Sequence, residues 1–267
     1  MVILGYVSAL CIGLSLGLIG SGGTILALPI FVYLFKIKEM QIATHYSMFV
    51  VGITAFIGAY KKHREALVDV RTAIYFLIPS LISLYFTRKI ILPIIPEIII
   101  DTNGFVLSKN MMLLLLFAIV MLFSSVSMIK NANQQEVDCF AKTPQASANP
   151  QKTTIAAIVV GILTALLGAG GGFLIIPTLV LLKEHCMKRA IGTSLIIITI
   201  NSFIGFMSDI KMEANWSMLL KFTGIAIIGM LLSIRWTNKM QGTTLKKLFG
   251  AIVLVMGICI ILKELFL

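Results

Sequence analysis

The chain has 267 residues, of which 58% are hydrophobic and 12% are charged, and its mean hydropathy is +1.01. This composition excludes a water-soluble domain of ordinary type and predicts an integral membrane protein. The net charge of +11 does not indicate a nucleic-acid partner, because the 22 Lys and Arg residues lie in short loops between apolar runs, where membrane topology accounts for them.

Ten apolar runs predict an all-α, polytopic protein with about eight to ten membrane segments. They cover roughly residues 2–19, 24–35, 43–60, 70–87 and 110–129, then 154–167, 172–182, 190–208, 216–234 and 246–265. The runs at 24–35 and 172–182 are short, because about 12 helical residues rise only about 18 Å against a hydrocarbon core of about 30 Å. These two runs predict half-helices or the arms of broken hairpins.

The runs divide into two membrane repeats, residues 1–129 and 153–267. A polar segment at 130–152 has no hydrophobic periodicity and is predicted to be a flexible linker in the cytoplasm. A second interruption, Arg88–Lys109, is apolar but contains Pro93 and Pro96, so it is too broken for a span. It is expected to be a connecting loop or a short lid at the membrane interface.

A glycine-rich motif occurs once in each repeat. The first copy reads Gly20-Ser21-Gly22-Gly23-Thr24 with Pro29, and the second, 148 residues later, reads Gly168-Ala169-Gly170-Gly171-Gly172 with Pro177. Four further pairs of segments also correspond: Ala43–Ser47 with Ala190–Ser194, Phe56–Gly58 with Phe203–Gly205, Val68–Val70 with Ala214–Trp216, and Phe117–Val120 with Gly250–Val253. Paired interruptions in the two halves of a repeat indicate a substrate site near the bilayer midplane.

Loop charge predicts that the two repeats are inverted. If each glycine-broken pair counts as two segments, the repeats are inverted, and 14 of the 22 Lys and Arg residues lie on one side of the membrane. If each pair counts as one crossing, the repeats are parallel and the division is 10 against 12. Because cytoplasmic loops carry the excess of Lys and Arg, the inverted arrangement is favoured, with both termini outside.

A helix interrupted inside the membrane exposes backbone N–H groups at the start of its second part, and these groups cannot stay unsatisfied in lipid. That helix end carries about half a positive charge, and glycine lets a ligand approach the bare backbone, so the breaks suit a small anion. Ser21 and Thr24 would add hydroxyl donors. In the alternative interpretation, the glycines only permit close helix crossing.

A second group of polar residues lies near the start of one span in each repeat. Thr44, His45 and Ser47 correspond to the region of Thr193 and Ser194, and Asn201 lies deeper, in line with Thr54. They either line the same cavity or bond to their own helices, and His45 either relays a proton or is an interfacial residue. The candidate substrate-binding residues are therefore Gly20, Ser21, Gly22, Gly23, Thr24, Thr44, His45, Ser47, Gly168, Gly170, Gly171, Gly172, Thr193, Ser194 and Asn201.

These motifs resemble a known family. Leu18–Pro29 and Leu166–Pro177 are similar to the signature of the sulfite exporter TauE/SafE family of membrane permeases, and Ala190–Leu195 resembles its second motif. The resemblance implies a multi-pass permease of the inner or plasma membrane that exports sulfite or a related organosulfur anion. The sequence departs from the family pattern at His45 and Tyr46, which replace the expected Gly-Thr pair.

The predicted function is therefore transport of a small anion by alternating access between two inverted repeats, driven by an ion gradient. The alternatives are a transporter or channel for another small solute or a cation, and a non-transporting membrane scaffold or accessory subunit. We expect no enzymatic activity, cofactor or metal site, because no nucleotide, nucleophile or metal-ligand motif is present. The expected partners are the anion, the lipid bilayer, a coupling ion and, through small-residue packing, a second copy of the chain.

Overall fold

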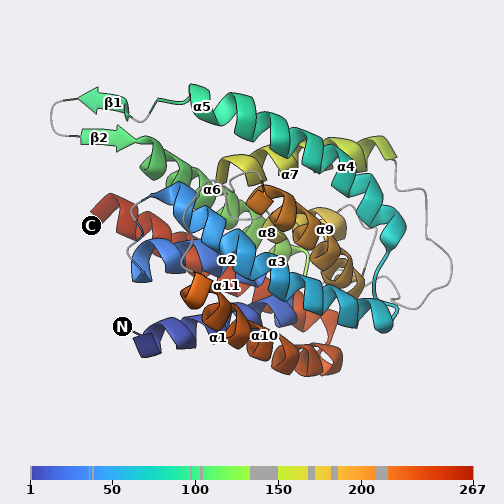
Figure 1. The fold of residues 1–267 in the computed structure, drawn as a ribbon. Helices are drawn as coiled ribbons and strands as arrows, with labels where there is room; N and C mark the ends of the chain where they lie inside the picture. Colours follow the sequence, from blue (N-terminus) through green and yellow to red (C-terminus); the bar gives the residue numbers. More distant parts are fainter. Residues whose placement is uncertain are drawn as a thin grey trace.

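The computed structural model is a bundle of helices with a short β-hairpin at one end (Figure 1). It describes residues 2–35, 37, 39–96, 98–102, 105–132, 150–167, 172–181, 186–207 and 216–266. Within these residues, six helices are long and apolar enough to cross a membrane, and two shorter apolar helices cover Gly5–Ile19 and Gln151–Leu166. The predicted class, a polytopic helical membrane protein, is confirmed.

The apolar runs of the first half form helices close to their predicted bounds. They are α1 (Val2–Ile19), α2 (Gly22–Pro29), the π-helix η1 (Ile30–Leu34), α3 (Met40–Arg64), α4 (Val70–Phe86) and α6 (Lys109–Lys130). The Asp69 side chain caps α4 by accepting from the Thr72 N–H, and Ser108 caps α6 by accepting from the Met111 N–H. Both side chains satisfy backbone donors that the first turn of a helix leaves bare.

The second half contains α7 (Pro150–Leu167), α8 (Gly172–Leu181), α9 (Met187–Met207), α10 (Trp216–Lys239) and α11 (Gly242–Phe266). α7 begins three residues before the predicted repeat boundary, at Pro150, since proline is tolerated in the first turn of a helix. The central part of the predicted linker, residues 133–149, lies outside the described residues, so the division into two repeats and a linker stays a prediction.

The segment between α4 and α6 differs from the loop predicted for Arg88–Lys109. The helix continues through η2 (Thr87–Ile91) and α5 (Leu92–Ile94), and Val70–Ile94 forms one candidate span. The prediction was wrong for residues 88–94, because the π-helical turn of η2, in which the Leu92 N–H bonds to the Thr87 carbonyl, carries the helix up to Pro93, and the helix ends one residue later. β1 (Ile98–Thr102) and β2 (Phe105–Ser108) then pair antiparallel in a small hairpin that departs from the all-α prediction.

α1 and α2 form a helical hairpin. Gly20 ends α1 with a φ of +75°, and the chain then turns back along α1. A Cβ added at Gly23 would lie 2.7 Å from the Ile12 carbonyl oxygen, and one added at Gly5 would lie 2.8 Å from Phe35 Cζ. The end of η1 therefore lies beside the start of α1, and the first glycine-broken segment enters and leaves at the same end of the bundle.

Outer helices of one half pack against outer helices of the other through small residues. Gly13 of α1 has no room for a side chain against the Ala226 carbonyl of α10, and Thr237 of α10 donates to the Gly17 carbonyl at 2.7 Å. In the same way, the Ser83 hydroxyl of α4 donates to the Ile158 carbonyl of α7 at 3.1 Å. Close backbone approach at small residues is the usual way for helices to associate in lipid.

Two further pairs join segments that the sequence repeat aligns with each other, α3 with α9 and α6 with α11. The neighbours across α3 and α9 are Met48 with Gly205, Gly52 with Ser202, and Gly58 with Leu195. Across α6 and α11, Gly257 packs near Leu122, whereas Gly250 accepts from the Ser125 hydroxyl. In both pairs one residue number rises as the other falls, so the paired helices are antiparallel.

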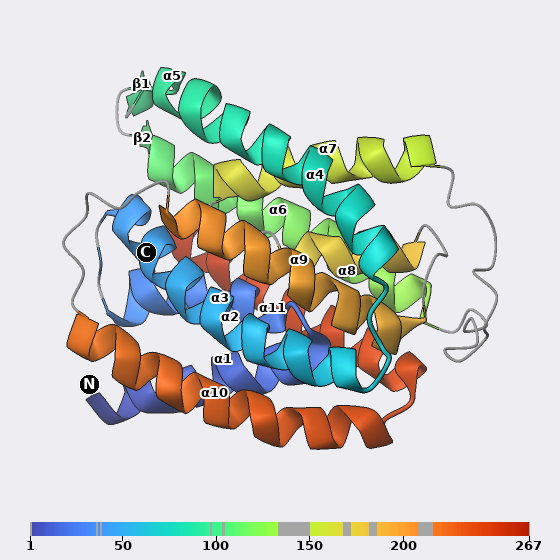
Figure 2. The ribbon, with the colours of Figure 1, turned by 45° about the vertical axis from the view of Figure 1, so that its right-hand side comes forward.

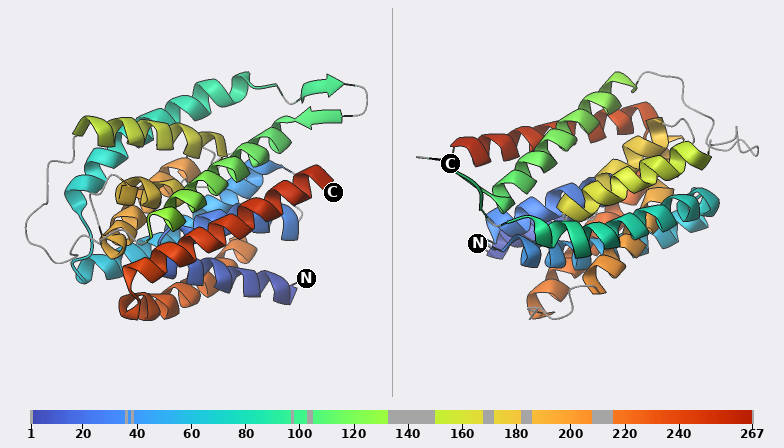
Figure 3. Two further views of the ribbon diagram at one scale, coloured as in Figure 1. Left: turned by 180° about the vertical axis from the view of Figure 1, so that it is seen from behind. Right: turned by 90° about the horizontal axis from the view of Figure 1, so that it is seen from above.

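The two ends of the bundle differ in charge. Figures 2 and 3 show both termini and the β-hairpin at the same end, here called the hairpin end. The last turns of α3 and α10 lie at the opposite end (Figure 2), where the Lys188 side chain of α9 also reaches the Asn238 carbonyl of α10. This end is called the basic end, because the last turn of α3 carries Lys61, Lys62 and Arg64, and that of α10 carries Lys239.

The surface and the interior show the polarity of a protein in lipid. Large apolar side chains project outward along the helices, and Phe123 on α6 is 77% exposed. Hydroxyl and amide side chains lie inside instead, and Ser21, Thr193 and Ser202 have no exposed surface. The interior polar residues are therefore the place to look for a site.

Candidate functional site

The first glycine break, residues 20–24, requires glycine at its first position. Gly20 has a positive φ, which residues with a side chain rarely adopt. A Cβ there would also lie 2.8 Å from Ile191 Cγ2 on α9 and 3.1 Å from Ile176 Cδ1 on α8. The break is therefore built against helices of the other half of the chain.

The last residue of the second glycine break, Gly172, meets the first break. Gly168, Gly170 and Gly171 lie outside the described residues, but α8 begins at Gly172. A Cβ added at Gly172 would lie 2.9 Å from Thr24 Cγ2 in α2 and 2.8 Å from Ile198 Cγ1 in α9. The starts of α2 and α8, which are about 150 residues apart in the chain, are thus in contact inside the bundle.

The hydroxyls of the first break have different roles. Thr24 Oγ1 donates to the Ser21 carbonyl at 2.6 Å, so its hydrogen is already used. Ser21 occupies the N-cap position of α2 but makes no side-chain cap, and its buried Oγ has no hydrogen-bond partner in the described part of the chain. A buried, unbonded hydroxyl is costly, particularly in lipid, and Ser21 is therefore the group of this break that is available to a ligand.

The predicted residues of α3 lie near the hairpin end. The Thr44, His45 and Ser47 side chains are all buried. Ser47 Oγ donates to the Thr44 carbonyl at 2.8 Å, which is the self-bonding alternative that the sequence left open. The His45 ring stacks on Phe206 of α9 with centroids 4.2 Å apart, so His45 contributes to the contact between α3 and α9.

The predicted residues of α9 divide in the same way. Thr193 Oγ1 accepts from the Asp69 N–H at 3.0 Å, and Ser194 Oγ donates to the Ile191 carbonyl at 2.9 Å. Asn201 differs, because it is 1% exposed and its Oδ1 accepts no hydrogen bond from the described residues. It follows Ile198, the neighbour of Gly172, by one helical turn, so the second half also supplies an unsatisfied polar group close to the breaks.

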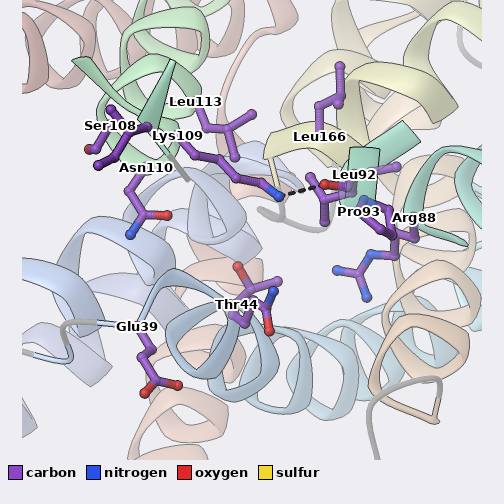
Figure 4. Close-up of a pocket in the computed structure, with 13 residues that line it drawn as sticks. Glu39, Thr44, Arg88, Leu92, Pro93, Ser108, Lys109, Asn110, Leu113 and Leu166 are labelled. Carbon is purple, nitrogen blue, oxygen red and sulfur yellow. Dashed lines mark hydrogen bonds between the residues drawn. The ribbon is translucent and has the colours of Figure 1, made fainter. Parts of the chain in front are cut away.

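A cavity of about 700 Å³ opens between α3, α5, α6 and α7 at the hairpin end. Figure 4 shows Lys109 and Arg88 extending into it from opposite walls, with Thr44 on a third wall. Its lining also includes Ala165 and Leu166, in the last turn of α7 before the second glycine break. Of the predicted site residues, the structure therefore brings Thr44 to this cavity, together with the last turn of α7.

A polar network lies at the basic end. The Lys62 side chain has no exposed surface and forms an ion pair with Glu65 at 3.0 Å and a hydrogen bond to Asn238 Oδ1 at 2.6 Å. Asn238 Nδ2 in turn donates to Glu65 at 2.9 Å. Burial raises the pKa of the Glu65 carboxyl, but the hydrogen bonds from Asn238 and Lys62 outweigh it and hold the pKa below its ordinary value. The network joins the end of α3 to the end of α10.

Comparison with known proteins decides the family. The model of the family described as "Sulfite exporter TauE/SafE" matches residues 6–260. The chain belongs to the TauE/SafE family. It is similar to a "Probable membrane transporter protein" of Xylella fastidiosa (strain Temecula1), with 26% identity over 95% of this chain and 92% of the relative. It is also similar to the "Probable membrane transporter protein YunE" of Bacillus subtilis (strain 168), with 27% identity over 98% and 99%.

No solved structure matches the chain. Membership of TauE/SafE, together with the apolar helices, makes the chain a multi-pass membrane protein of a transporter family. The resemblance based on the glycine motifs is confirmed over nearly the whole chain.

Arg88 and Lys109 line the cavity of this TauE/SafE chain but were not predicted as candidate residues, because they are the first and last residues of the segment interpreted as a loop. The available signal was the position of Arg88, a cation within the span Val70–Ile94. A cation inside a span indicates a functional position.

Proposed function

We propose that the chain is a permease that exports a small anion of the sulfite or organosulfonate class across the cell membrane by alternating access. The observation that carries this proposal is the contact between the starts of α2 and α8 beside the Ser21 hydroxyl, which has no hydrogen-bond partner among the described residues. Helix starts attract anions through their N–H groups and dipoles. The family description supplies the class of anion.

The same proposal includes two inverted repeats with the basic end in the cytoplasm. Its support is the antiparallel packing of α3 with α9 and of α6 with α11, since a two-fold axis in the membrane plane makes equivalent helices antiparallel. The concentration of Lys and Arg at one end supports the orientation. Transport is driven by an ion gradient, because the sequence has no nucleotide-binding motif.

The structural difference between the two ends of the bundle supports alternating access. A cavity opens at the hairpin end, whereas Lys62, Glu65 and Asn238 join α3 to α10 at the basic end. In the proposed cycle, the anion site is reached from one end at a time, and opening the basic end separates α3 from α10.

The experiment is anion flux into liposomes that contain the purified protein, for sulfite, sulfoacetate, sulfate and chloride under imposed ion gradients. The test variant is Ser21→Ala, which removes a hydroxyl without breaking a described protein hydrogen bond. A hydrogen bond to an anion contributes about 1.5–3 kcal/mol, so the half-saturating concentration should rise about 10- to 100-fold.

Ser15→Ala is the matched control, since Ser15 Oγ is also buried in the same hairpin but donates to the Ile12 carbonyl. It should leave the half-saturating concentration unchanged. Absence of anion-dependent flux under every gradient would overturn the proposal, and flux of a cation or neutral solute instead would reassign the substrate.

A further inference from the structure

The cavity at the hairpin end contains two cationic side chains that do not belong to the glycine breaks. The two cations that extend into it come from different elements, Arg88 from η2 and Lys109 from the first turn of α6. Among the described residues, Glu39 is the one acidic residue of its lining, and Figure 4 shows its carboxylate turned away from the two cations. The cavity is therefore positively charged where the cations face each other.

Lys109 is held in place by neutral groups. Its Nζ donates to the carbonyl oxygens of Leu92 and Ile95, the latter at 3.2 Å. An ammonium has three donors, so two carbonyls leave one hydrogen for a ligand. No carboxylate of the described residues lies within ion-pair distance of Lys109, so its charge is not neutralised by them.

The start of α6 adds to the positive potential. Lys109 and Asn110 open this 22-residue helix, and Ser108 caps it with its side chain. All three residues line the cavity. The positive end of the helix dipole thus faces the same space as the Lys109 ammonium.

The segment that forms one wall of this cavity is longer than the corresponding segment of the second half. The offset between corresponding positions is 146 residues at Val70 and Trp216 but 133 at Phe117 and Gly250, so the first half is 13 residues longer between them. The longer segment includes η2, α5 and the β-hairpin, which form one wall of the cavity. With the offset of 133 residues, the position in the second half that corresponds to Lys109 is Gly242.

We propose that this cavity is an anion vestibule in which Lys109 binds the transported oxyanion directly, at the hairpin end, on its way to or from the glycine breaks. The proposal rests on the proposed function for the identity of the anion. Arg88 forms the opposite wall, held by a hydrogen bond of 3.2 Å to the Gly205 carbonyl of α9. Oxyanions of the sulfite class suit the vestibule because they accept hydrogen bonds from several donors at once.

The test is direct binding of sulfite and of sulfate to the detergent-solubilised protein, measured by isothermal titration calorimetry. Lys109→Gln should raise the dissociation constant about tenfold, since it removes a charged donor. Lys89→Gln is the matched control: Lys89 is exposed, one residue beyond Arg88, and its ammonium donates to the Tyr85 hydroxyl. It should bind like the parent protein.

A second variant keeps the proposal testable if Lys109→Gln does not fold. Asn110 is an exposed lining residue, and Asn110→Asp places a negative charge in the vestibule without removing a buried contact. This variant should also weaken binding, and the loss should shrink at high salt, where charges are screened. Lys109→Arg should retain binding.

The vestibule proposal is wrong if Lys109→Gln and Asn110→Asp both keep the dissociation constant of the parent protein. It is also wrong if the parent protein binds no anion. The proposed function is judged separately by liposome flux. Flux that depends on Ser21 but not on Lys109 would support the proposed permease and contradict the vestibule.

Discussion

Replacing Gly20 by alanine tests whether the first break is held in the shape described. Alanine in the left-handed region costs about 1–2 kcal/mol. The added methyl would lie 2.8 Å from Ile191 Cγ2 and 3.1 Å from Ile191 Cα, and the second of these is a backbone atom that cannot rotate away. Overpacking of this kind costs a further 1–3 kcal/mol, for a total of about 2–5 kcal/mol.

The assay is thermal unfolding of the purified protein in detergent, and the expected drop in Tm for Gly20→Ala is about 5–15 °C. Gly224→Ala is the control, because Gly224 lies in the interior of α10 and a Cβ there meets no atom within 4 Å. This change should leave Tm unchanged or raise it slightly, since alanine favours a helix. Equal Tm values for Gly20→Ala and the parent would show that the positive φ and the contact with α9 are wrong.

Two further predictions concern single interactions. Glu65→Gln should destabilise the protein at pH 7, because it leaves the buried Lys62 charge uncompensated. The loss should be smaller than the roughly 3–5 kcal/mol of a fully buried pair, because the Glu65 side chain is 26% exposed. Since the folded-state pKa of Glu65 is lowered, its contribution is present above the ordinary carboxyl pKa and is lost as the pH falls through the folded value, so Tm of parent and variant should converge in acid. Ser125→Ala should cost about 0.6 kcal/mol by removing the 2.7 Å bond to the Gly250 carbonyl between α6 and α11. Ser124→Ala should cost nothing in the same unfolding assay, because the Ser124 hydroxyl has no hydrogen-bond partner in the described part of the chain; a larger loss there would contradict the assignment.

The spans could be located from the sequence because lipid acts on each segment separately. A continuous apolar run of sufficient length must become a helix to satisfy its backbone, whatever it packs against. Thus α9 was expected at about 190–208 and covers Met187–Met207. The exception is the extension of α4 to Ile94, since whether Pro93 breaks a helix depends on where the preceding turn ends.

The candidate site was predicted only in part. Ser21 and Asn201 were chosen for their residue types and are buried with unsatisfied atoms in the described structure. Ser47 and Ser194 were chosen for the same reason, yet they bond to their own helices. Residue type does not distinguish these two outcomes. Whether a hydroxyl bonds to the carbonyl one turn earlier in its own helix depends on its rotamer and its neighbours.

The sequence by itself determined that this is a membrane protein, where its apolar segments lie and which family it belongs to, and it predicted that its two halves correspond. Only the tertiary structure decided that the starts of α2 and α8 touch, with Thr24 beside Gly172, and that Lys109 and Arg88 face one cavity. The physical reason is that burial in lipid depends on the composition of one segment. Contacts between segments depend instead on pairs of small residues and single hydrogen bonds that are far apart in the chain.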